Sequence, residues 1–286
     1  MARRRNSGFI GATISCPRIE SGSMTPDILQ TRSGTIAQVT LFNPDKLNAI
    51  NAAMWRRLRV VMETLSADDS LRAVVIRGEG GHFAAGGDLE EMEAERSTRQ
   101  RAQRFHGETV APALAAVAEC QHPVVAAIQG ACAGGGLEIA AACDLRIAGT
   151  SARFGAPIMK LGFSMYPGEL AGLLEVCGAA TALEILLEGR LLSAAEALQK
   201  GLVTRVVADE AVAEEALATA QRIAAGAPLV ARAHKRMIRA MNRRVTSADL
   251  RIELPTDDPF WFLDTADHAE GMAAFREKRA PVFTGR

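Results

Sequence analysis

The feature that most constrains the fold of this sequence is a regular alternation of short apolar segments with longer helix-like ones. The short segments carry β-branched or small apolar residues and are bounded by Gly, Pro or Asp, as buried strands commonly are. They are residues 36–43, 71–78, 123–130 and 145–149. Between the first two, four apolar residues recur at the spacing of one helix face: Met54, Leu58, Val61 and Leu65. This alternation predicts an α/β fold with largely parallel sheets.

The pattern changes after about residue 210, where strand-like segments end. Residues 216–244 and 264–279 predict helices alone, whereas the charged and then alanine-rich stretch 89–120 predicts one or two helices. A helical tail on an α/β core often packs across a subunit boundary. We therefore expect an oligomer.

The first residues form a basic stretch whose apolar part is too short and too interrupted for a secretory signal. A transit-like leader and a start codon misassigned ahead of Met24 are both open. The stretch offers little to bury, so we expect a loosely ordered extension. The expected organisation is an extension over 1–25, a core over 26–210 and a helical oligomerisation region over 211–286.

Composition argues against several classes of partner. The 286 residues hold 33 Lys plus Arg and 33 Asp plus Glu, so no net positive charge is available to hold nucleic acid. Five cysteines stand at no CxxC spacing, which favours buried thiols in a reducing compartment, and we expect a cytoplasmic protein. No apolar run approaches the roughly 20 residues that a membrane helix needs, so we expect no membrane partner.

Common catalytic and nucleotide-binding motifs fail residue by residue. The segment GEGGHF has Phe83 where a dinucleotide fingerprint needs its third glycine, and no GxxxxGK[ST] occurs. Ser164 lies in GFSMY, which lacks the second glycine of a nucleophile elbow. The five histidines form no ligand pair at helical spacing. We therefore expect no metal site, and we assign each histidine to the surface or to a cap.

Two related glycine-rich stretches remain, HFAAGGDLEEM at 82–92 and GACAGGGLEIAAACD at 130–144. Glycine lets a ligand approach the backbone, and the first N–H groups of a helix have no intrahelical partner. Two such turns facing each other would supply donors to a developing oxyanion, and Glu138 could then move protons beside a polarised carbonyl. Tight packing and helix-dipole compensation would use the same residues, and the residues alone leave both interpretations open.

At these stretches the sequence resembles the crotonase family, also called the enoyl-CoA hydratase/isomerase superfamily. The resemblance extends from about Thr35 to the end of the chain, and the family's signatures occur in the family's order. They are LNAIN (47–51), FAAGGDLEEM (83–92), HPVVAAIQGACAGGGLEIAAACDLRIA (122–148), ARFGAP (152–157), LEILLEGRLLSAAEALQKGLV (183–203) and GMAAFREKRAPVF (271–283).

The resemblance implies a spiral of ββα units with a C-terminal helical region that makes trimers, and often hexamers as dimers of trimers. It implies an acyl-CoA thioester as the ligand, with neither a metal nor a redox cofactor. By position, the backbone N–H groups of Gly87 and Gly135 would form the oxyanion hole, and Glu138 would be a catalytic carboxylate.

The resemblance also implies where the CoA part of the ligand would lie. Ala85 and Leu89 match positions whose main chain recognises the adenine ring. Lys46 and Leu47 match positions along the pantetheine arm. Lys278 is a candidate contact to a CoA phosphate, from this subunit or a neighbouring one, and a solvated helix charge would look the same in sequence.

One departure from the family pattern bears directly on the reaction. Family hydratases carry a second glutamate after the proline of F-G-x-P-E, and this chain has Ile158 there. Isoleucine delivers no proton, and an acid or base group is commonly worth about 10²–10⁴ in rate. Downstream, a small insertion introduces Glu169, near the position from which some family isomerases present their single acid. Ile158 also fits the wall of a pocket for a bulky or fatty acyl chain.

Three functions therefore stay open. The first is an enoyl-CoA hydratase/isomerase-type enzyme that stabilises a thioester enolate, with Glu138 and Glu169 as catalytic candidates. The second is a single-acid enoyl-CoA isomerase or decarboxylase. The third is a non-catalytic acyl-CoA-binding protein that keeps the oxyanion hole as a cradle. RNA binding is disfavoured by the zero net charge.

Overall fold

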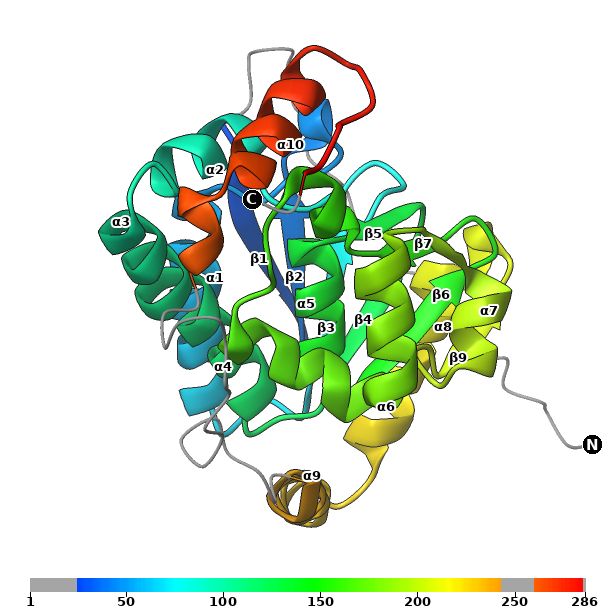
Figure 1. The fold of residues 1–286 in the computed structure, drawn as a ribbon. Helices are drawn as coiled ribbons and strands as arrows, with labels where there is room; N and C mark the ends of the chain where they lie inside the picture. The colour runs from blue at the N-terminus through cyan, green and yellow to red at the C-terminus, as the bar shows by residue number, and fades with distance from the viewer. Residues whose placement is uncertain (1–24, 243–259, 285–286) are drawn as a thin grey trace, which may run out of the picture.

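A computed structural model describes residues 25–242 and 260–284 of the chain (Figure 1). Its larger sheet has the strand order β1-β2-β3-β4-β6-β9, in which β1 pairs antiparallel with β2 and every other neighbouring pair is parallel. The strands are β1 Asp27–Ser33, β2 Ile36–Phe42, β3 Ala73–Gly78, β4 Val124–Ile128, β6 Leu145–Gly149 and β9 Arg205–Val207. The four strands expected from sequence are confirmed.

A second, smaller sheet lies beside the first and has the order β5-β7-β8, with bounds Ala131–Ala133, Arg153–Gly155 and Leu192–Ser193. Twice, a strand of the larger sheet leads into a strand of the smaller sheet and then into a helix. The first unit is β4-β5-α5 and the second is β6-β7-α6, with α5 at Gly135–Ala142 and α6 at Pro167–Glu188. This repetition is the expected arrangement of ββα units.

The larger sheet separates the apolar core into two layers. Along β3, Val74 and Ile76 face a layer shared with α1, α4, α5 and α6, whereas Ala73 and Val75 face a layer shared with α8. The alternation follows from the two-residue period of a strand buried on both faces. Helix α1 (Ala52–Ala67) buries the predicted face that includes Met54 and Leu58.

The region expected to hold one or two helices is divided more finely. It contains α2 (Leu89–Glu95), α3 (Arg99–Arg104), a π-helix η2 (Phe105–Val110) and α4 (Ala111–Glu119). The remaining helices are α7 Ala194–Gln199, α8 Val212–Ala225, α9 Pro228–Asn242 and α10 Ala266–Arg276, and the 3₁₀ turns are η1 Pro44–Lys46, η3 Pro157–Leu161, η4 Asp209–Ala211 and η5 Trp261–Asp264. The predicted N-terminal extension lies outside the described residues, apart from residue 25.

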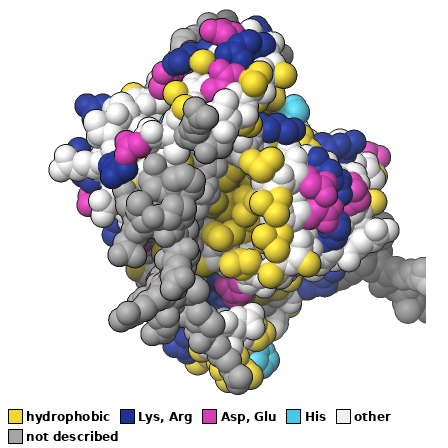
Figure 2. All heavy atoms as spheres, in the orientation of Figure 1, with side chains coloured by type: hydrophobic (Ala, Val, Ile, Leu, Met, Phe, Trp, Pro, Cys, Tyr) yellow, Lys and Arg dark blue, Asp and Glu magenta, His cyan; other side chains and the backbone are white. Residues whose placement is uncertain are grey.

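Helix α6 differs from the expectation that no apolar segment approaches the length of a membrane helix. It has 22 residues, and a window of 18 of them has a mean hydropathy of 1.8. By length and composition alone, it is the one helix among those described that could cross a membrane. Gly178 kinks the helix, and its first turn carries the buried Glu169. It packs against α5, leaving Leu183 and Leu187 exposed. Figure 2 shows apolar side chains gathered on this face of the molecule.

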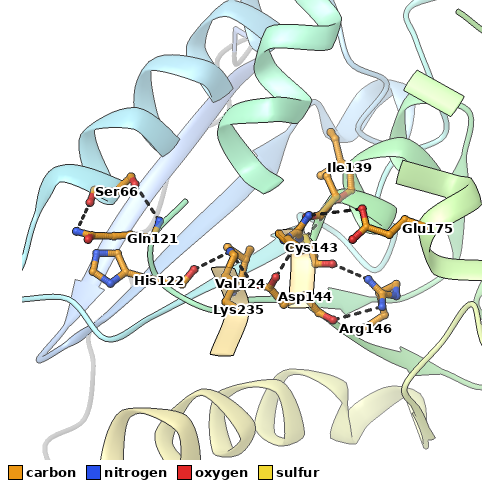
Figure 3. Close-up of polar contacts among 12 residues, drawn as sticks. Ser66, Gln121, His122, Val124, Ile139, Cys143, Asp144, Arg146, Glu175 and Lys235 are labelled. Carbon is orange, nitrogen blue, oxygen red and sulfur yellow. Dashed lines mark hydrogen bonds and ion pairs between the residues drawn. The ribbon is translucent and has the colours of Figure 1, made fainter. Parts of the chain in front are cut away.

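One carboxylate, that of Asp144, makes two of the ion pairs that attach helix α9 to the core (Figure 3). Asp144, between α5 and β6, pairs with Lys235 at 2.7 Å and with Arg239 at 2.9 Å. Its Oδ2 also accepts the Val124 N–H at 2.7 Å, and Lys235 donates to the carbonyl of His122 at 3.0 Å. Asp144 therefore joins the end of α5, the start of β4 and α9.

This network predicts the effect of removing its centre. Asp144→Ala removes the carboxylate that two largely buried cations share, and we expect the free energy of unfolding to fall by about 3 kcal/mol. Urea unfolding at fixed protein concentration measures the change. Glu214→Ala, an exposed carboxylate on α8, is the control and should change stability by less than about 0.5 kcal/mol. Equal stabilities for the two variants would contradict this role of Asp144.

Candidate active site

The two glycine-rich stretches predicted to face each other lie side by side. The N–H of Ala84 donates to the carbonyl of Ala131 at 2.9 Å, and the N–H of Ala133 donates to the carbonyl of Ala84 at 3.0 Å. A Cβ built on Gly136 would collide with the Ala84 carbonyl and lie 2.8 Å from the Ala84 Cβ. Gly136 therefore lets the start of α5 pack directly against the other turn.

In each turn, the backbone N–H of the last glycine before the helix, or of its first residue, is free to donate a hydrogen bond. Gly86 has a φ of 123° and Gly134 a φ of 46°, conformations that a side chain rarely adopts. Among the described residues, the N–H groups of the following Gly87 and Gly135 have no hydrogen-bond partner in the protein. Both glycines line the same cavity, so two donors open into one space.

That cavity has a volume of about 380 Å³ and is lined mainly by apolar atoms. Its polar side chains come from five elements: the ends of α2 and η3, the π-helix, and the first turns of α5 and α6. They are Arg96, His106, Glu138, Lys160 and Glu169. The two carboxyl groups proposed from sequence therefore share one space.

Glu169 is buried and has a specific partner. It is 5% exposed, and its Oε1 lies 2.6 Å from Nδ1 of His106, which is 6% exposed. Glu169 is therefore a buried, hydrogen-bonded carboxyl group and not an exposed carboxylate at a helix start. Glu138, on the first turn of α5, has no side-chain hydrogen bond within the described part of the chain.

Burial sets the protonation chemistry of this pair. Desolvation raises the pKa of both Glu138 and Glu169 above the ordinary carboxyl range, and the charge of Glu169 raises the pKa of Glu138 further. The Arg96 guanidinium opposes both shifts. Burial lowers the pKa of Arg96 only to about 10, so it stays charged at neutral pH. One buried cation therefore faces two carboxyl groups that resist ionising together.

The remaining predicted site residues divide into two groups. Ala85, Leu89 and Ile158 line the cavity with the glycines and glutamates. Lys46, Leu47 and Lys278 do not line it. Their roles toward CoA stay predictions.

The second group still has defined surroundings. The Lys46 ammonium lies 2.8 Å from Asp88 and 3.1 Å from Glu90, two carboxylates at the start of α2. Leu47 has a φ of 50° and its carbonyl accepts the Ala85 N–H at 3.0 Å, which ties η1 to the first glycine turn. Lys278 is exposed beyond the end of α10.

Sequence reasoning missed His106 and Arg96. The assignment of every histidine to the surface or to a cap is wrong for His106 and for His122, both of which are buried. No periodicity marks a one-turn π-helix, and the 63-residue separation between His106 and Glu169 gives no local pattern. A π-helix in the middle of a helical region is the one structural signal, since such turns are frequent at functional sites.

The architecture has solved counterparts. The crystal structure of an enoyl-CoA hydratase/carnithine racemase from Magnetospirillum magneticum matches at a TM-score of 0.74 and 48% identity, over 92% of this chain and 97% of that one. A methylmalonyl-CoA decarboxylase structure matches at a TM-score of 0.79 over 91% and 98%, and its 23% identity supports likeness of fold alone. Together with the ββα units, these matches define a protein of the crotonase fold.

Sequence comparison narrows this class to a family. The profile described as Enoyl-CoA hydratase/isomerase matches residues 31–286. A probable enoyl-CoA hydratase from Rhizobium meliloti (strain 1021) is 35% identical over 259 residues, which cover 91% of this chain and 98% of the relative. The chain belongs to the enoyl-CoA hydratase/isomerase family.

The contact between the two turns can be tested through Gly136. Alanine normally stabilises a helix relative to glycine, but here its Cβ meets the Ala84 backbone, so we expect Gly136→Ala to lower the free energy of unfolding by about 1–3 kcal/mol. Gly172→Ala on α6 is the matched control, because its Cβ would lie 4.0 Å from its nearest neighbour. Urea unfolding compares them, and equal stabilities would show that the turns are not in close contact.

Proposed function

We propose that this chain catalyses the addition of water to the double bond of a 2-enoyl-CoA thioester. The observation that carries the proposal is that two carboxyl groups, Glu138 on α5 and Glu169 on α6, line one cavity with two unpaired backbone donors. Glu169 supplies the second acid or base group that Ile158 cannot supply. The reaction needs no cofactor beyond the CoA that the substrate carries.

In this proposal the thioester oxygen binds between the N–H groups of Gly87 and Gly135. Attack of water at the β-carbon moves the double-bond electrons toward that oxygen, and the two donors stabilise the resulting enolate. Each donor of this kind is commonly worth about 3 kcal/mol of transition-state stabilisation. The apolar walls of the cavity exclude bulk water, which strengthens both contacts.

The raised pKa values of the two carboxyl groups support acid–base work near neutral pH. An ordinary exposed glutamate is fully ionised there, whereas burial moves these groups toward the working pH. A pair in which one carboxyl is protonated and the other ionised contains one acid and one base. Hydration of a double bond needs both.

A second candidate is isomerisation of a 3-enoyl-CoA to the conjugated 2-enoyl-CoA. The mainly apolar lining and Ile158 favour it, because a dry cavity protects an enolate from water. Isomerisation needs one carboxyl group, which removes a proton from one carbon and returns it two carbons away. Either Glu138 or Glu169 has the burial that this role requires.

The deciding experiment assays the purified protein on 2-enoyl-CoA and 3-enoyl-CoA of short and medium chain length. Absorbance follows the conjugated thioester, and mass spectrometry identifies the product. We expect loss of conjugation with a gain of one water, and we expect Glu138→Gln and Glu169→Gln each to lower kcat by about 10²–10⁴. Glu175→Gln, on α6 but outside the cavity, should keep the wild-type rate.

Other outcomes of this assay would favour one of the alternative functions. Gain of conjugation from the 3-enoyl substrate without hydration would replace the first candidate by the second. Conversion that survives both Glu138→Gln and Glu169→Gln would remove these groups from the mechanism. Binding of acyl-CoA with no conversion of either substrate would favour the non-catalytic alternative.

We further propose that the chain forms a trimer, or a hexamer built from trimers. Large apolar side chains are exposed on α6 and α9, and burying them is the main gain from self-association. They are Leu174, Leu183, Leu187, Leu229, Val230, Met237, Ile238 and Met241. Family membership supports the same assembly.

Light scattering after size exclusion tests this proposal. We expect a mass of three or six times 30.4 kDa, and a lower mass for the double variant Leu183→Lys/Leu187→Lys, because two buried ammonium groups would oppose assembly. Glu214→Lys makes a comparable charge change on α8 and should keep the wild-type mass. A wild-type mass of 30.4 kDa would contradict the proposal.

A further inference from the structure

Three polar side chains of the cavity form a continuous chain of contacts. The Nε–H of Arg96, at the end of α2, donates to Nε2 of His106 at 3.0 Å. Nδ1 of His106, in the π-helix, lies 2.6 Å from Oε1 of Glu169 on the first turn of α6. All three residues line the cavity that holds Glu138.

The guanidinium determines which nitrogen of the imidazole carries the proton. Arg96 has only donors, so Nε2 of His106 must present its lone pair to the Arg96 Nε–H. A neutral imidazole carries one proton, which is then on Nδ1. The Nδ1–H therefore donates to the Glu169 carboxyl, and the carboxyl oxygen accepts.

Any other distribution of protons on His106 and Glu169 would break the hydrogen bond to Arg96 or the one between His106 and Glu169. A doubly protonated His106 would point Nε2–H at the Arg96 donor and would place two buried cations together, which is why burial and Arg96 lower the pKa of His106. A protonated Glu169 donating to Nδ1 would need an imidazole with no proton at all. Donation to Oε1 favours the ionised form of Glu169.

Aromatic rings hold the side chains of Arg96 and His106 in place. The His106 ring packs against Phe105, Tyr166 and Phe260, with ring centroids 5.2, 6.1 and 5.6 Å away. The Arg96 guanidinium carbon lies 3.9 Å above the centre of the Phe163 ring. These ring contacts restrict both groups to orientations that keep the hydrogen bonds.

We propose that His106, fixed as the Nδ1–H tautomer by Arg96, is a positioning residue that keeps Glu169 ionised and oriented as the base, which leaves Glu138 as the acid. This inference rests on the hydration proposed above. Glu138 fits the role of acid because no side chain among the described residues donates a hydrogen bond to it, whereas Glu169 accepts one from His106. The geometry thus assigns different roles to two residues of the same type.

The proposed step balances with water as the co-reactant. The Glu169 carboxylate takes one proton of water as the oxygen bonds to the β-carbon, and the π electrons of the double bond move to the thioester oxygen. The enolate then collapses as its α-carbon takes the proton of Glu138. Glu169 ends protonated and Glu138 ionised, and proton exchange with solvent restores the starting state.

The test compares three histidine variants by stopped-flow hydration kinetics over pH 5–10, a range that brackets the ordinary histidine pKa. His106→Phe keeps an aromatic ring but removes both hydrogen bonds. We expect kcat to fall about 100-fold with little change in KM, and the acid limb of the kcat profile to move up by about one pH unit, because Glu169 loses its donor.

His106→Asn places an amide donor near the position of Nδ1, so we expect this variant to recover at least about tenfold of the lost kcat. The exposed His234→Gln is the control.

Other titratable groups near Arg96, His106 and Glu169 also contribute to the measured pH profile. They are Glu138 on α5, Tyr166 before α6 and His268 on α10. Burial, and after it the Arg96 charge, lowers the pKa of His268. In wild-type protein, ¹⁵N NMR should show His106 protonated on Nδ1 and bare on Nε2 across the profile. A proton on Nε2 would overturn the inference without any variant, even if His106→Phe failed to fold.

The two proposals fail separately. If Glu138→Gln and Glu169→Gln abolish hydration while His106→Phe keeps the wild-type kcat and acid limb, hydration stands and the role of His106 is wrong. If the wild-type protein hydrates no 2-enoyl-CoA, the proposed function fails, and the role of His106 fails with it whatever its tautomer. Recovery by His106→Asn with the predicted tautomer supports both.

Discussion

Two carboxyl groups buried beside a single guanidinium govern the chemistry that this cavity can perform. Each ionised carboxylate loses its hydration on burial, and Arg96 can compensate for only one of them. The electrically balanced state therefore contains one carboxylate, one carboxylic acid and one guanidinium. Such a site differs from two exposed glutamates, which would both be ionised at neutral pH and would offer two bases and no acid. The charge balance, more than the identity of either residue, makes acid–base catalysis available.

The charged residues of the cavity lie where helices begin, end or are interrupted. Glu138 and Glu169 stand on the first turns of α5 and α6, where unpaired N–H groups favour an acceptor. Arg96 caps the end of α2, and His106 lies in the π-helix between α3 and α4. Because a regular helix interior offers neither free backbone groups nor extra radial space, the irregular positions converge on the cavity. The parallel sheet and its two apolar layers hold these ends in register.

Sequence predicted the parts of this arrangement that have a local physical signature. Four of the six strands of the larger sheet follow from short apolar segments bounded by Gly, Pro or Asp, whereas β1 and β9 escape prediction. The face of α1 follows from a spacing, and the two glycine turns follow from residues with special backbone freedom. The strands of the smaller sheet escape prediction because two or three residues carry no periodicity. The buried state of Glu169 and its contact with His106 also escape, since they depend on how an insertion folds against a π-helix 63 residues earlier. Family resemblance pointed to Glu138 by position and to Glu169 only approximately, because Glu169 stands near, though not at, the position of the single acid in some family isomerases.

In the proposed hydration, the second carboxyl group comes from Glu169, and this has a physical consequence for Ile158. At that position η3 forms a wall of the cavity, and an apolar side chain there adds no charge to the balance around Arg96. A glutamate at 158 in addition to Glu138 and Glu169 would place three carboxyl groups near one buried cation, Arg96, in a desolvated space. At least two of them would then be driven to the protonated form, and the base would be weakened. The isoleucine and the glutamate of α6 are therefore best understood together, as two halves of one alternative solution to the same electrostatic constraint.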